Sequence, residues 1–121
     1  MGITRSILVQ ISARHLENTT IFDVTGDIDL ANSPAVRKAF LSEIREKKIP
    51  RVIVNLLAVK YIDSSGIASL VEGLKASRDL KARFILFGLS KSAREVLQLS
   101  RLLKLFEIYE NEEQALSAES V

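Results

Sequence analysis

The residues best suited to chemistry in this chain lie in one short stretch, residues 61–76, which reads YIDSSGIASLVEGLKA. Its apolar residues recur at the spacing of one face of an amphipathic helix: Ile67, Leu70, Val71 and Leu74. Asp63, Ser64 and Ser65 therefore stand where this helix begins, among backbone N–H groups that have no intrahelical acceptor. Such side chains can cap the helix, an anion can bind beside them, or one of the serines can be modified.

Hydrolytic chemistry is not supported by the residues around these serines. A nucleophilic serine needs a base, usually a histidine held by a carboxylate. His15 is the single histidine, and it falls in a predicted turn between two strands, where a surface position is expected. The sequence has neither a Gly-x-Ser-x-Gly elbow nor a glycine-rich phosphate loop. We therefore predict no catalytic residue and no cofactor.

Carboxylates are the main metal ligands that the sequence could bring together, because the chain has no cysteine and one histidine. Asp27, Asp29 and Asp63 form the one cluster that could meet in space, as a weak Mg²⁺ site. Loop carboxylates more often cap a backbone amide. We therefore predict no metal site.

The composition is that of a single globular domain. The chain has 121 residues, of which 47% are hydrophobic and 26% charged, and its net charge is +2. This charge is too small to indicate a nucleic-acid partner, and Phe84, Phe87 and Phe106 lie in strand-like apolar runs that predict a core position. No apolar run reaches the ~20 residues of a membrane span. The lack of cysteine suits a cytoplasmic protein.

The charge is unevenly distributed along the second half of the chain. Between residues 75 and 104, eight basic residues outnumber two acidic ones, and the segment that follows is acidic. The commoner reading of such a segment is a solvated helix face. The alternative is a docking surface for an acidic partner.

The chain alternates strand-like and helix-like segments. Two strands, 6–12 and 20–26, are predicted to pair antiparallel through a polar turn. The segments that follow are a helix at 34–47 capped by Ser33, a strand at 51–57, a helix at 65–79, a strand at 82–88, a helix capped by Ser90, a strand at 105–110 and a helix at 112–118 with a capping box of Asn111 and Gln114.

This order, β-β-α-β-α-β-α-β-α, predicts an α/β fold. We expect a mixed, mostly parallel β-sheet of four to five strands packed with about four helices. Sites in such folds lie at the carboxyl ends of the parallel strands. The loop that carries Asp27 and Asp29 and the loop that carries Asp63 both follow parallel strands, so they should converge at this edge of the sheet.

Three stretches of the chain together resemble one protein family. VTGDIDLANSPAVRKAF resembles a strand that ends in glycine and an acidic loop before the first helix. RVIVNLLAVKYIDSSGIASLV resembles a central strand and a phosphoacceptor loop, and FGLSKSAREVLQLSRLLKLFEIYENEEQAL resembles the closing elements. Their order and spacing are similar to those of the STAS-domain anti-sigma factor antagonists, which are small bacterial switch proteins. The resemblance covers nearly the whole chain, so residues 1–121 are expected to form a single STAS domain.

The resemblance implies a function controlled by phosphorylation. In this family the unphosphorylated antagonist binds an anti-sigma factor that is also a serine kinase, and the sigma factor is released. The kinase uses ATP to phosphorylate the first serine after the aspartate, here Ser64, and the complex then dissociates. A PP2C-type phosphatase reverses the modification. Ser65 is the less favoured acceptor. The resemblance also implies a cytoplasmic location, and we expect a monomer.

The same resemblance implies partner-binding residues in both loops at this edge: Asp27, Asp29, Asp63, Ser64, Ser65, Gly66 and Ile67. Gly66 is expected to leave room for a partner's backbone. Three positions depart from the family pattern, because Asn55 replaces a usual aspartate, Leu57 a small polar residue and Ala68 a frequent glycine. STAS domains also serve as subunits of lipid-transport complexes and of stress-sensing scaffolds, which is the alternative function.

Overall fold

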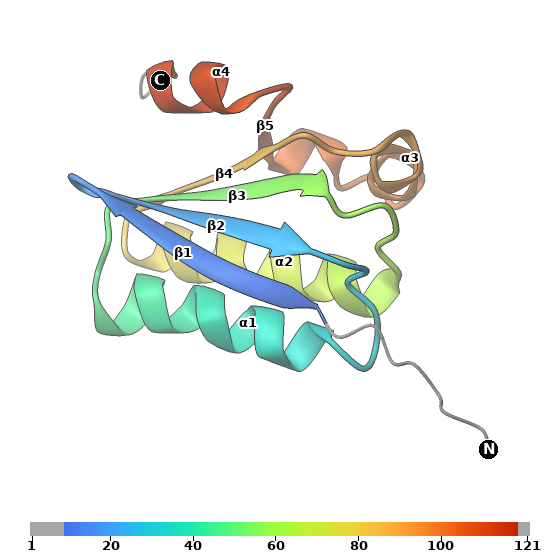
Figure 1. Ribbon diagram of the computed structural model, residues 1–121, viewed down its shortest axis with the longest axis horizontal. Coiled ribbons are helices and arrows are strands. Elements are labelled where there is room, and N and C mark those ends of the chain that lie inside the picture. The colour runs from blue at the N-terminus through green and yellow to red at the C-terminus, as the bar shows by residue number, and fades with distance from the viewer. Residues whose placement is uncertain (1–8, 119–121) are drawn as a thin grey trace.

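The computed structural model describes residues 9–118, which fold around one five-stranded sheet (Figure 1). The strands lie in chain order, from β1 to β5. β1 (Gln10–Leu16) is antiparallel to β2 (Thr19–Thr25). β3 (Arg51–Ala58), β4 (Arg83–Phe87) and β5 (Glu107–Tyr109) then follow, each parallel to its neighbour. The predicted mixed, mostly parallel sheet is confirmed.

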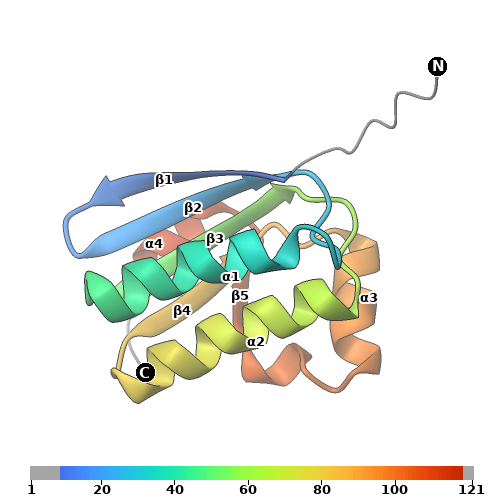
Figure 2. The same ribbon diagram turned by 90° about the horizontal axis from the view of Figure 1, so that it is seen from below.

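Helices cover both faces of this sheet. α1 (Ser33–Leu41) and α2 (Ser64–Asp79) lie side by side on one face, and α4 (Glu112–Ser117) lies over part of the other (Figures 1 and 2). α3 (Lys91–Leu99) lies at the end of the sheet toward which the parallel strands run, near the start of α2 (Figure 2). The predicted element order, with four helices, is confirmed for the described part of the chain.

The main core lies between the sheet and the pair α1 and α2. Phe40 of α1 packs edge-on between Phe22 of β2 and Phe84 of β4, with ring centroids 5.3 and 5.4 Å apart. Phe106 is buried beside Phe84. A second, smaller cluster lies beneath α4 and comprises Ile21, Ile53, Ile85, Phe87 and Ala115. The prediction that the three phenylalanines of the second half are core residues is confirmed.

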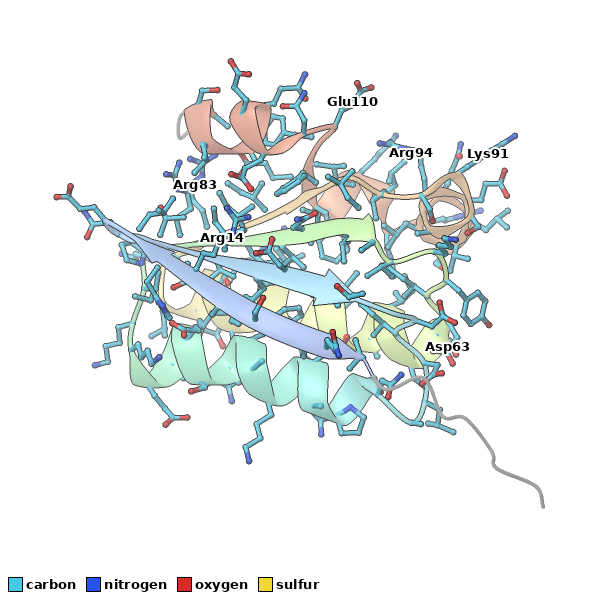
Figure 3. The ribbon with its side chains drawn as sticks, viewed as in Figure 1. Arg14, Asp63, Arg83, Lys91, Arg94 and Glu110 are labelled. Carbon is cyan, nitrogen blue, oxygen red and sulfur yellow. The ribbon has the colours of Figure 1, made fainter. Side chains whose placement is uncertain are left out.

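α4 is held against the sheet by caps and by arginines. The predicted capping box is present in part, because Asn111 Oδ1 accepts from the Gln114 N–H at 2.9 Å, whereas Gln114 Oε1 accepts from the Glu110 N–H and not from that of Asn111. At the other end of α4, Arg51 Nη1 donates to the Leu116 carbonyl and Arg83 Nη1 donates to the Ala118 carbonyl, at 3.0 and 2.8 Å. Figure 3 shows Arg83 below this end of α4. These cations satisfy carbonyls that a helix leaves without intrahelical donors.

The position of the first strand was predicted wrongly. The apolar run ILVQI indicated a strand at 6–12, whereas β1 spans Gln10–Leu16, and residues 6–8 lie outside the described part of the chain. His15 is therefore in a strand rather than in the turn, and its Nε2 lies 3.0 Å from Glu43 Oε1. β1 is an edge strand whose side chains are almost all exposed, so hydrophobicity could not locate it.

The helix that follows β2 differs from the prediction at both ends. Ser33 is its first residue rather than its cap, and Asn32 precedes it. After Leu41 the chain continues as a π-helical turn, Ser42–Glu46. This turn places Glu43 and Ile44 side by side in buried positions.

Glu43 is a buried carboxylate supported by three neighbours. It is 4% exposed and accepts from Lys47 Nζ at 2.9 Å and from Thr20 Oγ1 at 3.2 Å, besides its contact with His15. Burial alone would raise the pKa of the Glu43 carboxyl, but the hydrogen bonds from His15, Lys47 and Thr20 outweigh it and leave this pKa below its ordinary value. The cluster joins β1 and β2 to the end of the first helix.

Candidate functional site

The predicted serine-bearing loop forms the start of α2. Asp63 is the N-cap residue, with extended backbone, and its Oδ1 accepts from the Gly66 N–H at 2.9 Å. Ser64 is the first helical residue, and the Ile67 N–H donates to the Asp63 carbonyl at 2.9 Å. α2 thus begins at Ser64, one residue earlier than the sequence predicted. Asp63 performs the capping, which leaves both serine hydroxyls available for other contacts.

The two loops at this edge of the sheet meet, as the sequence predicted. Ile28 and Ile62 form a parallel bridge in which the Ile28 N–H donates to the Tyr61 carbonyl at 3.0 Å. The Asp63 N–H donates in turn to the Ile28 carbonyl at 3.1 Å. The second carboxylate oxygen of Asp63, Oδ2, accepts from the Leu30 N–H at 3.1 Å. One side chain therefore fixes both the helix start and the neighbouring loop.

Asp27 and Asp29 lie in this neighbouring loop, but they hold the start of α1. Asp29 Oδ1 accepts from the Asn32 N–H at 3.0 Å, and the Asp27 carbonyl accepts from Asn32 Nδ2 at 3.0 Å. Both aspartates are half-buried. Among residues 9–118, no group of three or more acidic, histidine or cysteine side chains is arranged to hold a metal ion. The Asp29 side chain therefore holds the turn that leads into α1, whose N-cap residue is Asn32.

Gly66 is buried, and the space left by its missing side chain is filled within the chain. A Cβ at this position would lie 2.3 Å from the Ile28 carbonyl oxygen and 2.6 Å from the Ile62 Cγ2 atom. Real contacts to a Cβ are essentially never below about 3 Å, so no other residue fits without a shift of backbone. Gly66 makes room for the neighbouring loop, and not for a partner's backbone as expected. Ile67 is also buried, at 5% exposure.

The two serines face different surfaces of α2. Ser64 is exposed and lies at one end of a hollow of about 450 Å³ between α2 and the α3 region. Ser65 is half-buried and lines a hollow of about 310 Å³ on the α1 side, together with Leu30 and Arg37; Ala68 and Glu72 border both hollows. Because successive residues of a helix point about 100° apart, a partner that approaches one hydroxyl does not meet the other in the same way.

Two exposed apolar side chains flank the serine-bearing loop, and the sequence did not single them out. Leu30 is 74% exposed and Tyr61 is 52% exposed. Each lies in a segment tied to Asp63 or to Ile28 by backbone hydrogen bonds. Large apolar residues kept in water at the rim of a polar loop are typical of contact surfaces. The sequence feature that could have indicated these two residues is their position in loops next to acidic residues, and this feature alone is weak evidence for a contact surface.

The strongest electrostatic perturbations lie on the opposite face of the sheet from α1 and α2. Arg14 bridges Asp23 and Glu112, at 2.6 and 2.5 Å, and this pairing raises the pKa of the guanidinium while it lowers the pKa of the Asp23 carboxyl. Asn55 Nδ2 also donates to Asp23 Oδ1 at 2.8 Å. The asparagine that departs from the family pattern therefore supplies a donor to a neighbouring carboxylate, which an aspartate at this position could not do while ionised.

A family model for the STAS domain matches residues 10–115. The chain belongs to the STAS domain family. An anti-sigma-B factor antagonist of Listeria monocytogenes is 33% identical to this STAS domain over 104 residues, which are 85% of this chain and 81% of that protein. The family resemblance predicted from the DSSG loop and the two stretches that flank it is confirmed.

Solved structures show the same fold. The crystal structure of an anti-sigma factor antagonist from Mycobacterium paratuberculosis has a TM-score of 0.80 and 21% identity, covering 90% of this chain and 92% of that one. The structure of the Bacillus cell fate determinant SpoIIAA in its phosphorylated form has a TM-score of 0.70 and 21% identity, covering 88% and 96% of the two chains. In the described part of this STAS domain, no helix has both the length and the apolar character needed to cross a bilayer.

Proposed function

We propose that this STAS domain is an anti-sigma factor antagonist whose binding is switched by phosphorylation of Ser64. In the unphosphorylated state it binds an anti-sigma factor serine kinase in the cytoplasm, and the sigma factor is freed. The observation that carries the proposal is the exposed position of Ser64 as the first residue of α2, directly after the capping Asp63. The proposal is supported by the relative that is named an anti-sigma-B factor antagonist.

The chemistry of the switch is a phosphoryl transfer in both directions. The kinase transfers the γ-phosphoryl group of ATP to the Ser64 oxygen, a base of the kinase accepts the hydroxyl proton, and ADP leaves. A PP2C-type phosphatase hydrolyses the ester with water and restores the hydroxyl, with release of inorganic phosphate. This STAS domain supplies only the acceptor, so none of its own residues needs to act as a base.

The position of Ser64 suits a phosphate that alters binding without unfolding the helix. The start of a helix has unpaired N–H groups and the positive end of the helix dipole, which favour an anion. The phosphate adds about −1.5 to −2 charges and takes the net charge of the chain from +2 to about zero. It also places this charge next to Asp63, so the local surface becomes strongly negative.

Partner contacts are expected around the exposed residues of this edge. Ser64, Leu30 and Tyr61 are accessible, whereas Gly66 and Ile67 are buried and act by shaping the loop. Asp27, Asp29 and Ser65 are half-buried and remain proposed contacts at the margin. We propose that the protein is a monomer that exchanges partners through this one edge.

The proposal is tested by incubating the protein with ATP and the anti-sigma kinases encoded in its own genome, followed by mass spectrometry of the α2 peptide. The expected result is one phosphate on Ser64 in the wild type and in Ser65→Ala, and none in Ser64→Ala. Binding of the kinase should weaken about tenfold or more in Ser64→Glu, because a carboxylate partly imitates the phosphate. Equal affinity of wild type and Ser64→Glu, together with no phosphate on Ser64, would refute the switch.

A further inference from the structure

The hollow that begins at Ser64 continues as a groove between two helices. Its lining residues are those of one α2 face and of the end of α3: Ser64, Ile67, Ala68, Val71, Glu72, Val96, Ser100 and Leu102. Most of them are apolar, and the hollow has a volume of about 450 Å³. We refer to these residues as the α2–α3 groove. Leu99 follows Val96 by three positions on α3 and is 84% exposed, so helix spacing places it near the same side of α3 as Val96.

Positive charge gathers at the end of the groove that lies away from Ser64. Along α2, the residues 64, 68, 71, 75 and 78 follow each other at spacings of four and three, so Lys75 and Arg78 extend the groove-lining stripe. The Arg78 side chain reaches the Leu105 carbonyl, 3.5 Å from its Nη2. Arg101 and Lys104 line another hollow, of about 290 Å³, and lie close in the chain to the groove-lining residues Ser100 and Leu102.

These four cations have no partner of opposite charge within residues 9–118. The ion pairs in this part of the chain involve other basic residues, namely Arg14, Lys47 and Arg83, and His15 contacts Glu43. Glu72 is the one carboxylate among the lining residues of the groove. An apolar groove with a neutral serine at one end, Lys75 and Arg78 beyond the other end, and Arg101 and Lys104 next to its α3 side is complementary to a partner with apolar and acidic side chains.

We propose that the α2–α3 groove is the docking site for an acidic amphipathic helix of the anti-sigma kinase. The inference rests on the proposed function and adds to it the surface that selects the partner. From Ser64 to Arg78 the groove-lining stripe spans fifteen residues of α2, and the fourteen rises between them give a length of about 21 Å. A helix of four turns matches this length, with its apolar stripe on Val71 and Val96 and its carboxylates near Arg78. A concave lining fits a convex helix better than a flat bilayer.

The geometry connects this docking site to the switch. Phosphorylation puts a dianion at the Ser64 end of the groove, where an acidic helix would have to pass or end. Like charges brought together at an interface are repelled, and the repulsion is strongest where water is excluded. The basic end of the groove selects an acidic partner, and the serine end rejects the same partner after modification.

The charge contribution is tested with two double variants of equal charge change. Lys75→Glu/Arg78→Glu reverses the basic end of the groove, and Lys38→Glu/Arg45→Glu reverses two exposed cations of the α1 region as a control. The dissociation constant of the recombinant kinase is measured by calorimetry at about 0.05 M and about 0.5 M NaCl. We expect the groove variant to bind about tenfold or more weakly at low salt and the control within about twofold, with a smaller difference at high salt.

The apolar contribution is tested at the exposed Ala68. Ala68→Trp fills the groove, whereas Ala68→Ser leaves it open, and circular dichroism checks that both variants fold. Because Ala68 also borders the hollow beside Ser65, loss of kinase binding in Ala68→Trp but not in Ala68→Ser supports the groove when Lys75→Glu/Arg78→Glu weakens binding as well. Unchanged affinity in Ala68→Trp and in the groove charge variant would overturn the groove while leaving Ser64 phosphorylation intact. A wild type that neither binds nor accepts phosphate from any kinase would overturn both proposals.

Other occupants of the groove are separated by two further measurements. Sedimentation that shows self-association of the wild type, abolished by Lys75→Glu/Arg78→Glu, would mean that a second copy occupies the groove and would overturn the kinase as occupant. Binding to anionic lipid vesicles that is lost in the same variant, without any effect on the kinase, would overturn it in favour of a membrane surface.

Discussion

Substitution of Gly66 by alanine gives the sharpest test of how the two loops of the site are packed. Helix propensity alone predicts that Gly66→Ala stabilises the protein by about 1 kcal/mol. The structure predicts the opposite sign, because the new Cβ would lie 2.3 Å from the Ile28 carbonyl oxygen. This neighbour is backbone and cannot rotate away.

The magnitude follows from what must move. Overpacking of a close-packed site costs about 2 kcal/mol. A shift of Ile28 also weakens its two backbone hydrogen bonds, to Tyr61 and from Asp63, which contribute about 1 kcal/mol each. After subtraction of the propensity gain, Gly66→Ala should lower the free energy of unfolding by about 3 kcal/mol. With a urea m-value of about 1.5–2 kcal/mol/M, the midpoint should fall by about 1.5–2 M.

Urea denaturation followed by circular dichroism measures this difference, and Ala68→Gly in the same helix is the control. Ala68 is exposed, so its replacement reports propensity without packing and should cost about 1 kcal/mol. Amide hydrogen exchange should also be faster at Ile28 and Asp63 in Gly66→Ala. A variant as stable as the wild type, with unchanged exchange at these amides, would refute the close approach of the two loops.

Two further predictions concern carboxylates with assigned hydrogen bonds. Asp63→Ala removes the cap of α2 and the acceptor of the Leu30 N–H, and should lower the free energy of unfolding, measured by thermal denaturation, by about 1–2 kcal/mol. Asp63→Asn keeps an acceptor oxygen and should lower it by about half as much. Equal stability of Asp63→Ala and wild type would contradict the cap. Because the pKa of Glu43 is lowered in the folded state, the unfolded chain binds this proton first as pH falls. The stabilisation by ionised Glu43 is therefore present above its ordinary pKa of 4.5 and is lost as the pH drops through the folded value. Glu43→Gln should lose about 1–2 kcal/mol near pH 7 and show a flatter decline toward pH 3 in urea titrations; a parallel decline in both proteins would contradict the assignment.

The sequence predicted the buried elements of the fold because their patterns are strong. The strand at β3 reads as a continuous apolar run, and α2 has an apolar stripe with a capping aspartate, so both were located within a residue or so. The edge strand β1 has no such pattern, because it is exposed along nearly its whole length. The neighbouring apolar run was therefore predicted to be the first strand, at 6–12. Periodicity locates a strand only where one of its faces is buried.

At the candidate site, the sequence predicted which loops would meet but not how their residues are used. The convergence of both loops follows from strand order, which sequence pattern can supply. The contact between Gly66 and the Ile28 carbonyl depends on the exact approach of two backbones, which no local pattern records. The burial of Glu43 was not predicted for a related reason, because its partners Thr20 and His15 lie on strands that are distant in the sequence. Long-range partners decide the role of a polar residue.

β1 forms one edge of the sheet, and among residues 9–118 no strand pairs with its outer side. The unpaired N–H and C=O groups of such an edge are a template on which another extended chain can add. Arg14, paired with Asp23, and His15, in contact with Glu43, stand along this strand. Charged and polar side chains on an edge strand disfavour its pairing with another chain, so we expect replacement of Arg14 and His15 by apolar residues to lower solubility at high protein concentration first.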